Sequence, residues 1–121
     1  MTYKTLICDT AATGRLMACD ALEDTRFSVI AEVSNGRDAI ESFRLHRPDL
    51  VILSLTLPDM DGSEVMEEIL AIDEEAIVII QFAMGQDSRA RACLGIGRAK
   101  GSVCKPYAPA RLLKVLDEIF D

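Results

Sequence analysis

The stretch from Pro48 to Gly62, PDLVILSLTLPDMDG, constrains the fold of this chain more than any other. It contains the apolar run Leu50–Leu53, in which two of the four residues are β-branched. A short apolar run of this kind predicts a strand that is covered on both faces. Such strands lie in the middle of parallel sheets, and ligands bind at their carboxyl ends. The polar residues at and just beyond that end are Ser54, Thr56, Asp59 and Asp61.

The rest of the chain alternates between short apolar runs and segments with helical periodicity. The expected strands are Thr5–Cys8, Phe27–Val33, Leu50 to Ser54 or Leu55, Ala76–Phe82 and Ser102–Cys104. The expected helices are Ala12–Leu22, the segment from the Ser34–Gly36 turn to Leu45, Ser63–Ile72, Asp87 or Ser88 to about Gly95, and Pro109–Phe120. This alternation predicts one α/β domain over residues 1–121, a doubly wound parallel sheet between two layers of helices.

The spacing of apolar residues also predicts which side chains of the helices face the sheet. In the first helix these are Leu16, Ala18, Cys19 and Leu22. In the second they are Ala39, Ile40 and Phe43, and in the third Val65, Met66, Ile69 and Leu70.

Length and composition favour a single cytoplasmic domain. The 121 residues, half of them hydrophobic, suffice for one core and are too few for two domains. No apolar run approaches the roughly 20 residues that span a bilayer, so we expect no membrane partner. The N-terminus, MTYKTLICDT, lacks the basic region and long apolar stretch of a signal peptide.

Cysteine spacing favours buried, reduced thiols over a disulfide or a zinc site. The four cysteines, Cys8, Cys19, Cys93 and Cys104, form no CxxC pair, and His46 is the single histidine. Cysteine is also a common small core residue.

Charge is distributed unevenly along the chain. The segment from Ser88 to Asp121 has seven basic and three acidic residues, a formal charge of +4, whereas the whole chain carries −7. An acidic protein is a poor nucleic-acid binder, so we expect no direct contact with nucleic acid. The basic segment could meet an acidic protein partner, or it could be a solvated surface. Its expected exposed members are Arg89, Arg91, Lys100, Arg111 and Lys114.

Four landmarks of the sequence resemble response-regulator receiver domains of the CheY-like family. They are LICDT near the start, the Pro48–Gly62 stretch, the apolar fourth strand, and Lys105-Pro106-Tyr107 near the end. The resemblance covers the whole chain and implies a flavodoxin-like, three-layer fold with strand order 2-1-3-4-5.

The resemblance implies a phosphorylation pocket, and this chain departs from its pattern at several positions. Asp9 matches the first of two metal-binding acids and is the only acidic ligand position retained, because Thr10 stands at the second. Ser54 stands at the phosphoacceptor aspartate. Ala83 is assigned to the switch hydroxyl after the fourth strand, and Ser102 to the aromatic of the fifth. Lys105 is retained.

These departures predict a degenerate pocket made of Asp9, Thr10, Ser54, Thr56, Ala83 and Lys105. We expect no Mg²⁺ and no other cofactor, because Mg²⁺ prefers carboxylate ligands and Asp9 is the single certain one. Phosphorylation of Ser54 would need an activating base. Lys105 needs an acceptor because an unpaired, partly buried ammonium is costly, and Asp9 or the Ser54 hydroxyl is expected to supply it. The alternative is that Lys105 extends to water.

The leading hypothesis is a signalling module of a two-component or phosphorelay system that has lost aspartyl phosphorylation and acts through protein contacts, without enzymatic activity. The second is a receiver phosphorylated at a non-standard residue, namely Asp9, Asp59 or Ser54. The third is a small enzyme on the same fold. The expected partner is a histidine kinase, an output domain or another signalling protein. The resemblance implies a contact or homodimer surface on the fourth helix, fifth strand and fifth helix, with Ser102, Arg91, Lys100 and Arg111 on it.

Overall fold

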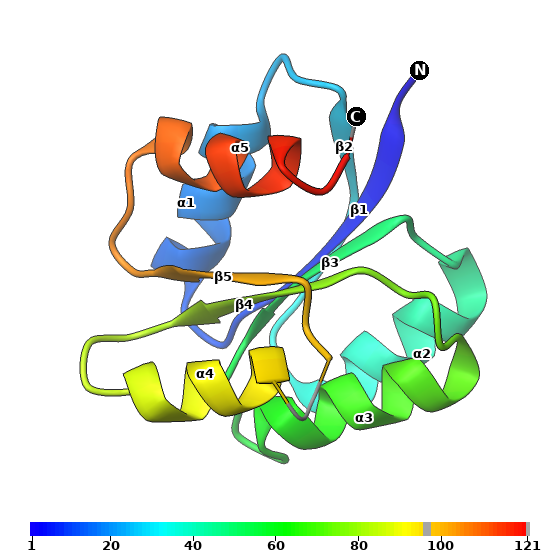
Figure 1. The fold of residues 1–121 in the computed structure, drawn as a ribbon. Coiled ribbons are helices and arrows are strands. Elements are labelled where there is room, and N and C mark those ends of the chain that lie inside the picture. The colour runs from blue at the N-terminus through cyan, green and yellow to red at the C-terminus, as the bar shows by residue number, and fades with distance from the viewer. Residues whose placement is uncertain (96–97, 121) are drawn as a thin grey trace.

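The computed structural model describes residues 1–95 and 98–120 and contains one five-stranded sheet, shown edge-on in Figure 1. The strand order is β2-β1-β3-β4-β5, and all four strand pairs are parallel. This confirms the doubly wound fold expected from the sequence. The strands are β1 (Tyr3–Cys8), β2 (Phe27–Val33), β3 (Leu50–Ser54), β4 (Val78–Phe82) and β5 (Gly101–Cys104).

Five helices cover the sheet in two layers, α1 and α5 on one face and α2, α3 and α4 on the other (Figure 1). The core is divided accordingly into two clusters of buried side chains, one under each layer. The helices are α1 (Ala12–Leu22), α2 (Gly36–His46), α3 (Gly62–Ile72), α4 (Asp87–Gly95) and α5 (Pro109–Asp117). Within the described part of the chain, none of these helices is long and apolar enough to cross a membrane.

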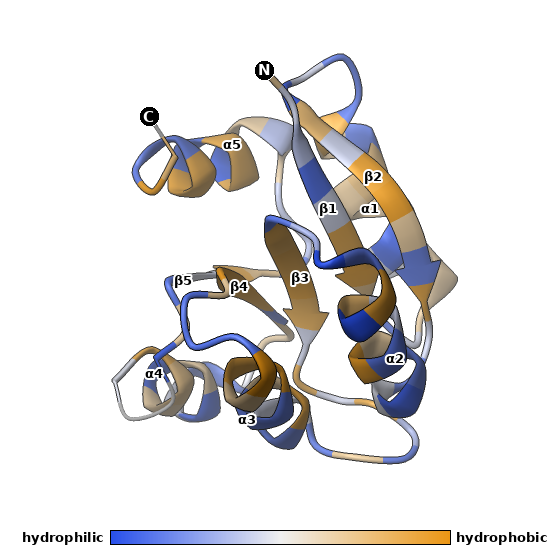
Figure 2. Cartoon of the chain, turned by 90° about the vertical axis from the view of Figure 1, so that its right-hand side faces the viewer, coloured by the Kyte–Doolittle hydropathy of each residue, from blue (hydrophilic) through white to orange (hydrophobic). Residues whose placement is uncertain are grey.

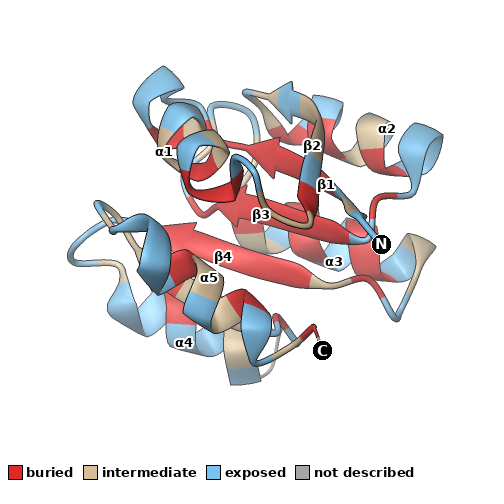
Figure 3. Ribbon diagram, turned by 90° about the horizontal axis from the view of Figure 1, so that it is seen from above, coloured by how far each residue is buried: buried red, intermediate tan, exposed pale blue. Residues whose placement is uncertain are grey.

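The two strands at the centre of the fold, β3 and β4, are buried along their whole length (Figure 3). Figure 2 shows β3 as hydrophobic up to its last residue, whereas the helices alternate between hydrophobic and hydrophilic residues. A strand with helices on both faces must be apolar on both sides, which explains why the Leu50–Leu53 run shows no alternation. The polar exceptions, Ser54 and Gln81, pair with each other at the carboxyl ends of the two strands.

Helix starts follow the polar residues that the sequence provides. Asn35 is the N-cap of α2 and accepts a hydrogen bond from the Asp38 backbone N–H. Asp61 is the N-cap of α3 and forms a capping box with Glu64. This places Asp61 at the start of a helix.

Two details of the sequence-based prediction were wrong. Leu16 was expected to face the sheet, but it is 58 % exposed, and the buried face of α1 is formed by Gly14, Ala18, Ala21 and Leu22. The last helix was expected to reach Phe120, but α5 ends at Asp117. After that residue the chain turns, and the Phe120 ring packs against the rings of Tyr3 and Phe27, which also contact each other.

Gly62, the first residue of α3, provides a test of how closely this helix approaches β3. A Cβ at this position would lie 2.2 Å from the Ser54 carbonyl oxygen and 2.7 Å from the Leu55 Cα. Because these are backbone atoms, Gly62→Ala should lower the free energy of unfolding by about 1–3 kcal/mol, the usual cost of overpacking. Chemical denaturation monitored by circular dichroism measures this change.

Gly95→Ala is the matched control, because a Cβ there would meet nothing within 4 Å. It should leave stability unchanged or raise it by up to about 1 kcal/mol, the helix-propensity difference between the two residues. Equal effects of the two substitutions would contradict the close approach of α3 to β3.

Candidate functional site

A buried ion pair lies at the carboxyl edge of the sheet, where β1 and β5 end. Asp9 follows β1 and is 2 % exposed, and Lys105 follows β5. The Lys105 Nζ donates to Asp9 Oδ2 at 2.8 Å, which confirms the pairing expected from the sequence. The other carboxylate oxygen, Oδ1, accepts the Ala11 backbone N–H at 2.9 Å. The carboxylate is thus held from both sides by groups of its own chain.

Gln81 and Tyr107 extend this pair into a chain of hydrogen bonds. The Gln81 Nε2 donates to Asp9 Oδ2 at 2.8 Å, and the Tyr107 hydroxyl donates to Gln81 Oε1 at 2.6 Å. Gln81 is completely buried. Burial, followed by the negative charge of Asp9, raises the pKa of Tyr107, so its hydroxyl keeps the proton that it donates. Asp9, Gln81, Lys105 and Tyr107 form what we call the Asp9 cluster.

Sequence reasoning did not assign a role to Gln81 or Tyr107. One signal was available for Gln81, since a glutamine inside the apolar strand VIIQF must find polar partners once it is buried. Nothing in the sequence indicated that the partner would be Asp9, which is 72 residues away.

Thr10, Ser54 and Thr56 lie beside the Asp9 cluster, and their polar groups form hydrogen bonds with neighbouring residues. The Thr10 hydroxyl donates to the Ser34 carbonyl oxygen at 3.2 Å. The Thr10 and Ser54 hydroxyls also both lie 3.5 Å from the Thr56 carbonyl oxygen, so these three residues converge. Ser54 is 4 % exposed, at the end of β3. The structure therefore gathers these sequence-predicted residues at one edge of the sheet.

Ala83 does not belong to this group. It is exposed, lies one residue beyond the end of β4, and its backbone N–H donates to Gln86 Oε1 at 2.9 Å. The strand itself ends at Phe82, which is mostly buried. Neither residue carries a hydroxyl, so both positions at the end of β4 lack the switch group.

The two aspartates of the β3–α3 loop are engaged at helix starts. Asp59 accepts the backbone N–H groups of Gly36 and Arg37 at the start of α2, and these bonds lower its pKa. For Asp61, burial acts to raise the pKa, but hydrogen bonds from Ser63 and the charge of Arg89 outweigh it and lower the pKa. Both carboxylates are therefore ionised and committed to local structure.

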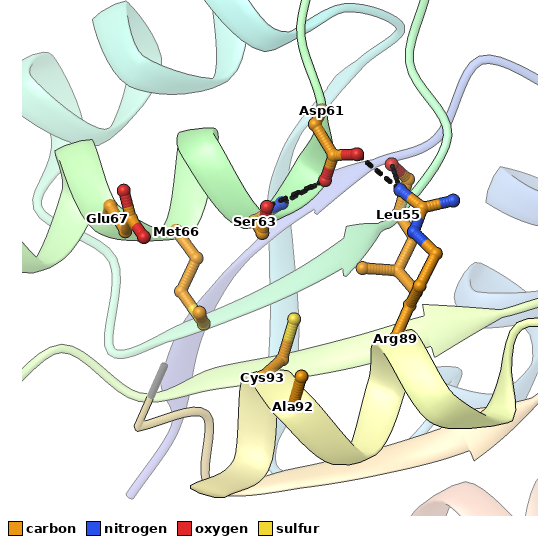
Figure 4. Close-up of a pocket in the computed structure, with 8 residues that line it drawn as sticks. All are labelled: Leu55, Asp61, Ser63, Met66, Glu67, Arg89, Ala92 and Cys93. Atoms are coloured by element: carbon orange, nitrogen blue, oxygen red, sulfur yellow. Dashed lines mark hydrogen bonds and ion pairs between the residues drawn. The ribbon is translucent and has the colours of Figure 1, made fainter. Parts of the chain in front are cut away.

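The β3–α3 loop is tied to the β4–α4 loop by Gln86 and to α4 by Arg89. The Gln86 Nε2 donates to the Thr56 hydroxyl at 2.7 Å. The Arg89 guanidinium forms an ion pair with Asp61 across a hollow of about 260 Å³ between α3 and α4 (Figure 4). Arg89 is exposed, as expected for a member of the basic segment, but this pairing turns its guanidinium toward α3. Its sequence neighbours gave no sign of that, because Asp61 lies 28 residues away.

The other residues predicted for the surface of α4, β5 and α5 have the expected accessibility. Arg91, Lys100, Arg111 and Lys114 are exposed, and Ser102 on β5 is partly exposed. We refer to these four basic residues as the basic face.

Mg²⁺ is the ion that the family resemblance implies, and the donors at this edge do not fit it. Mg²⁺ binding to proteins relies on one or two carboxylates in a strict octahedral geometry. Here the single carboxylate already accepts three hydrogen bonds, and Thr10 and Ser54 offer neutral hydroxyls bonded to backbone carbonyls. Over residues 1–95 and 98–120 no three Cys, His, Asp or Glu side chains converge as a metal site.

All four cysteines are free thiols, but the expected burial holds only for Cys8 and Cys93, since Cys19 and Cys104 are partly exposed. Burial, followed by the charge of Asp9, raises the pKa of Cys8 to about 12, and burial with Glu32 raises that of Cys19 to about 11. Cys93 is also buried, and its pKa is raised mainly for that reason. Thiols with such pKa values are poor nucleophiles at neutral pH.

A five-stranded parallel sheet of this order, with a lysine and an aspartate paired at its carboxyl edge, defines a flavodoxin-like domain of the receiver type. The sequence profile of the response regulator receiver domain matches residues 5–117. The chain belongs to the response regulator receiver domain family, and its function is receiver-domain signal transduction in a two-component system. Receiver domains are typically non-enzymatic and interact with other signalling proteins.

Several relatives align over nearly the whole chain. Chemotaxis protein CheY of Bacillus subtilis is 39 % identical over 118 residues, which cover 98 % of each chain. Chemotaxis protein CheY of Thermotoga maritima is 34 % identical over 119 residues, again 98 % of each. Among solved structures, the CheX-CheY-BeF3-Mg+2 complex from Borrelia burgdorferi matches with a TM-score of 0.91 and 27 % identity, over 98 % of this chain and 90 % of that one.

Substitution of Asp9 tests the importance of the Asp9 cluster for stability. Asp9→Ala leaves the Lys105 ammonium and the Gln81 amide without their shared acceptor. Removal of one partner of a buried pair costs about 3–5 kcal/mol, and the partial exposure of Lys105 (20 %) favours the lower end, about 3 kcal/mol. The free energy of unfolding by urea measures this loss.

Asp117→Ala is the control, since it removes a far more exposed carboxylate that pairs with Arg26 at 3.0 Å. It should cost no more than about 1 kcal/mol. Adding Lys105→Met to Asp9→Ala should restore part of the lost stability, because it removes the stranded charge. An unchanged melting temperature for Asp9→Ala would contradict the buried pair.

Proposed function

We propose that this chain is a receiver module that signals without aspartyl phosphorylation, acting through protein contacts. The observation that carries the proposal is the state of the Asp9 carboxylate, which is buried and accepts three hydrogen bonds from its own chain. Phosphoryl transfer relies almost entirely on positioning and on neutralisation of charge by a metal ion and cationic groups. With Ser54 at the position that the resemblance gives to the phosphoacceptor, both the acceptor and the metal site are missing.

Phosphorylation at a non-standard residue is the second candidate, and three contacts weigh against it. Asp59 is held by the N-terminus of α2. Asp9 is sequestered in the Asp9 cluster. Ser54 has a hydroxyl directed to the Thr56 carbonyl oxygen, and both oxygens of Asp9, a candidate base at this edge, already accept hydrogen bonds. An enzymatic role has still less support, because no nucleophile hydrogen-bonded to a free base is present among the described residues.

The basic face is the proposed site of protein contact. Arg91 lies on α4, Lys100 precedes β5, and Arg111 and Lys114 lie on α5, all exposed. An acidic protein surface would complement them, and a second copy of this chain, with its net charge of −7, is the alternative. Charges of this kind affect the rate of association and its dependence on salt more than the final affinity.

A phosphoryl donor and a phosphoryl analogue test the proposal directly. After incubation with acetyl phosphate and Mg²⁺, the intact mass of this protein should be unchanged. With BeF3⁻ and Mg²⁺, fluorine NMR should show no bound fluoride species, whereas CheY of Borrelia burgdorferi, crystallised with both components, is the positive control. A stoichiometric gain of one phosphoryl group would refute the proposal, and peptide mapping would then identify the residue.

Charge reversal tests the contact surface. Arg91→Glu combined with Arg111→Glu should slow association with a partner isolated by affinity capture and flatten its salt dependence, leaving the fold intact by circular dichroism. Arg37→Glu with Arg44→Glu is the control, because these two arginines are also exposed but lie on α2. Surface plasmon resonance at several salt concentrations measures both. Equal effects of the two pairs, or none for the first, would exclude the basic face.

A further inference from the structure

The Asp9 carboxylate lies against Gly14 of α1 and Gln81 of β4, and we call these two residues its cradle. A Cβ at Gly14, on the buried face of α1, would lie 2.1 Å from Asp9 Oδ2 and 2.6 Å from its Cγ. The carboxylate can therefore occupy this position only because residue 14 has no side chain. Glycine inside a helix lowers helix stability by about 1 kcal/mol relative to alanine, and α1 has a glycine at the position that faces Asp9.

Gln81 closes the cradle from β4. Its Nε2 donates to Asp9 Oδ2 at 2.8 Å and also lies 3.3 Å from the Gly14 carbonyl oxygen. The ionised carboxylate only accepts hydrogen bonds, so the NH₂ group of Gln81 must face it. The Tyr107 hydroxyl donates to the opposite side of the amide at 2.6 Å and fixes that orientation. All polar groups of this buried amide are thereby used.

A cation could use Asp9 only if the carboxylate left this cradle. Oδ2 carries the bonds from both Lys105 and Gln81, and Oδ1 carries the bond from Ala11. Rotation toward an ion would remove the acceptor that the Lys105 ammonium shares with the Gln81 amide, which is costly where Asp9 and Gln81 are buried. Groups that orient a metal ligand typically change metal affinity 10–100-fold.

We infer that Gly14 and Gln81 are positioning residues that withhold Asp9 from metal binding, a block independent of the missing carboxylates at positions 10 and 54. The inference rests on the proposed function and extends it. It implies that the pair Thr10→Asp and Ser54→Asp, which supplies the absent acids, by itself creates at most a weak Mg²⁺ site. Release of Asp9 from its cradle is the additional requirement.

Titration calorimetry with Mg²⁺ alone on four variants tests this. The base variant carries Thr10→Asp and Ser54→Asp. One derivative adds Gly14→Ala, which expels the carboxylate sterically. A second adds Gln81→Leu with Tyr107→Phe, which removes the amide and the hydroxyl that would otherwise be stranded. The fourth adds Gly95→Ala as a control at a position with open space around it.

The Gly14 and Gln81 derivatives should each bind Mg²⁺ about tenfold or more tightly than the base variant, while the Gly95 derivative should match it. If Gly14→Ala prevents folding, judged by circular dichroism, the Gln81 derivative decides the question. Equal affinity in all four variants, or no binding in any, would overturn the inference. Neither result would affect the proposed function, which fails only if the wild-type protein takes up a phosphoryl group.

Discussion

The carboxylate of Asp9 is a charge in a place that water hardly reaches, and the carboxyl edge of the sheet is arranged around it. An isolated charge in such a site is strongly disfavoured, so it must be paired and fully hydrogen-bonded. The partners come from three separated parts of the chain: Ala11 at the start of α1, Gln81 on β4 and Lys105 after β5. The Asp9 carboxylate therefore links the first, fourth and fifth strands at the edge where receiver domains have their functional site.

The polar groups around Asp9 form hydrogen bonds with one another, and this has a consequence for signalling. On the proposal made above, the pocket has no open acceptor for a cation and no nucleophile for a phosphoryl group, so its shape does not depend on either. The β3–α3 loop is also held in place, through the bond of Thr56 to Gln86 and the ion pair of Asp61 with Arg89 on α4. A receiver held in this way would act as a constant surface, and regulation would come from the partner or from the amount of protein.

The sequence was sufficient for the fold because burial determines the pattern of strands and helices. The β3 run was readable locally, and the Asp9–Lys105 pair followed from the family resemblance and the cost of an unpaired ammonium. The exposure of Leu16 could not be predicted, because Gly14 and Ala21 allow α1 to turn a different face to the sheet. The roles of Gly14, Gln81 and Arg89 depend on contacts between distant segments, which no local pattern encodes.

Proton exchange and chemical shift of the Gln81 side-chain amide show most directly whether the Asp9 carboxylate stays bonded to its own chain and closed to cations. The chain has two glutamines and one asparagine, so three side-chain amides are easily assigned in a ¹H–¹⁵N NMR spectrum. We predict that the Gln81 amide protons exchange far more slowly than those of Gln86 and that their chemical shifts stay unchanged when Mg²⁺ and BeF3⁻ are added. Fast exchange of the Gln81 amide, or a shift on addition of Mg²⁺, would contradict it.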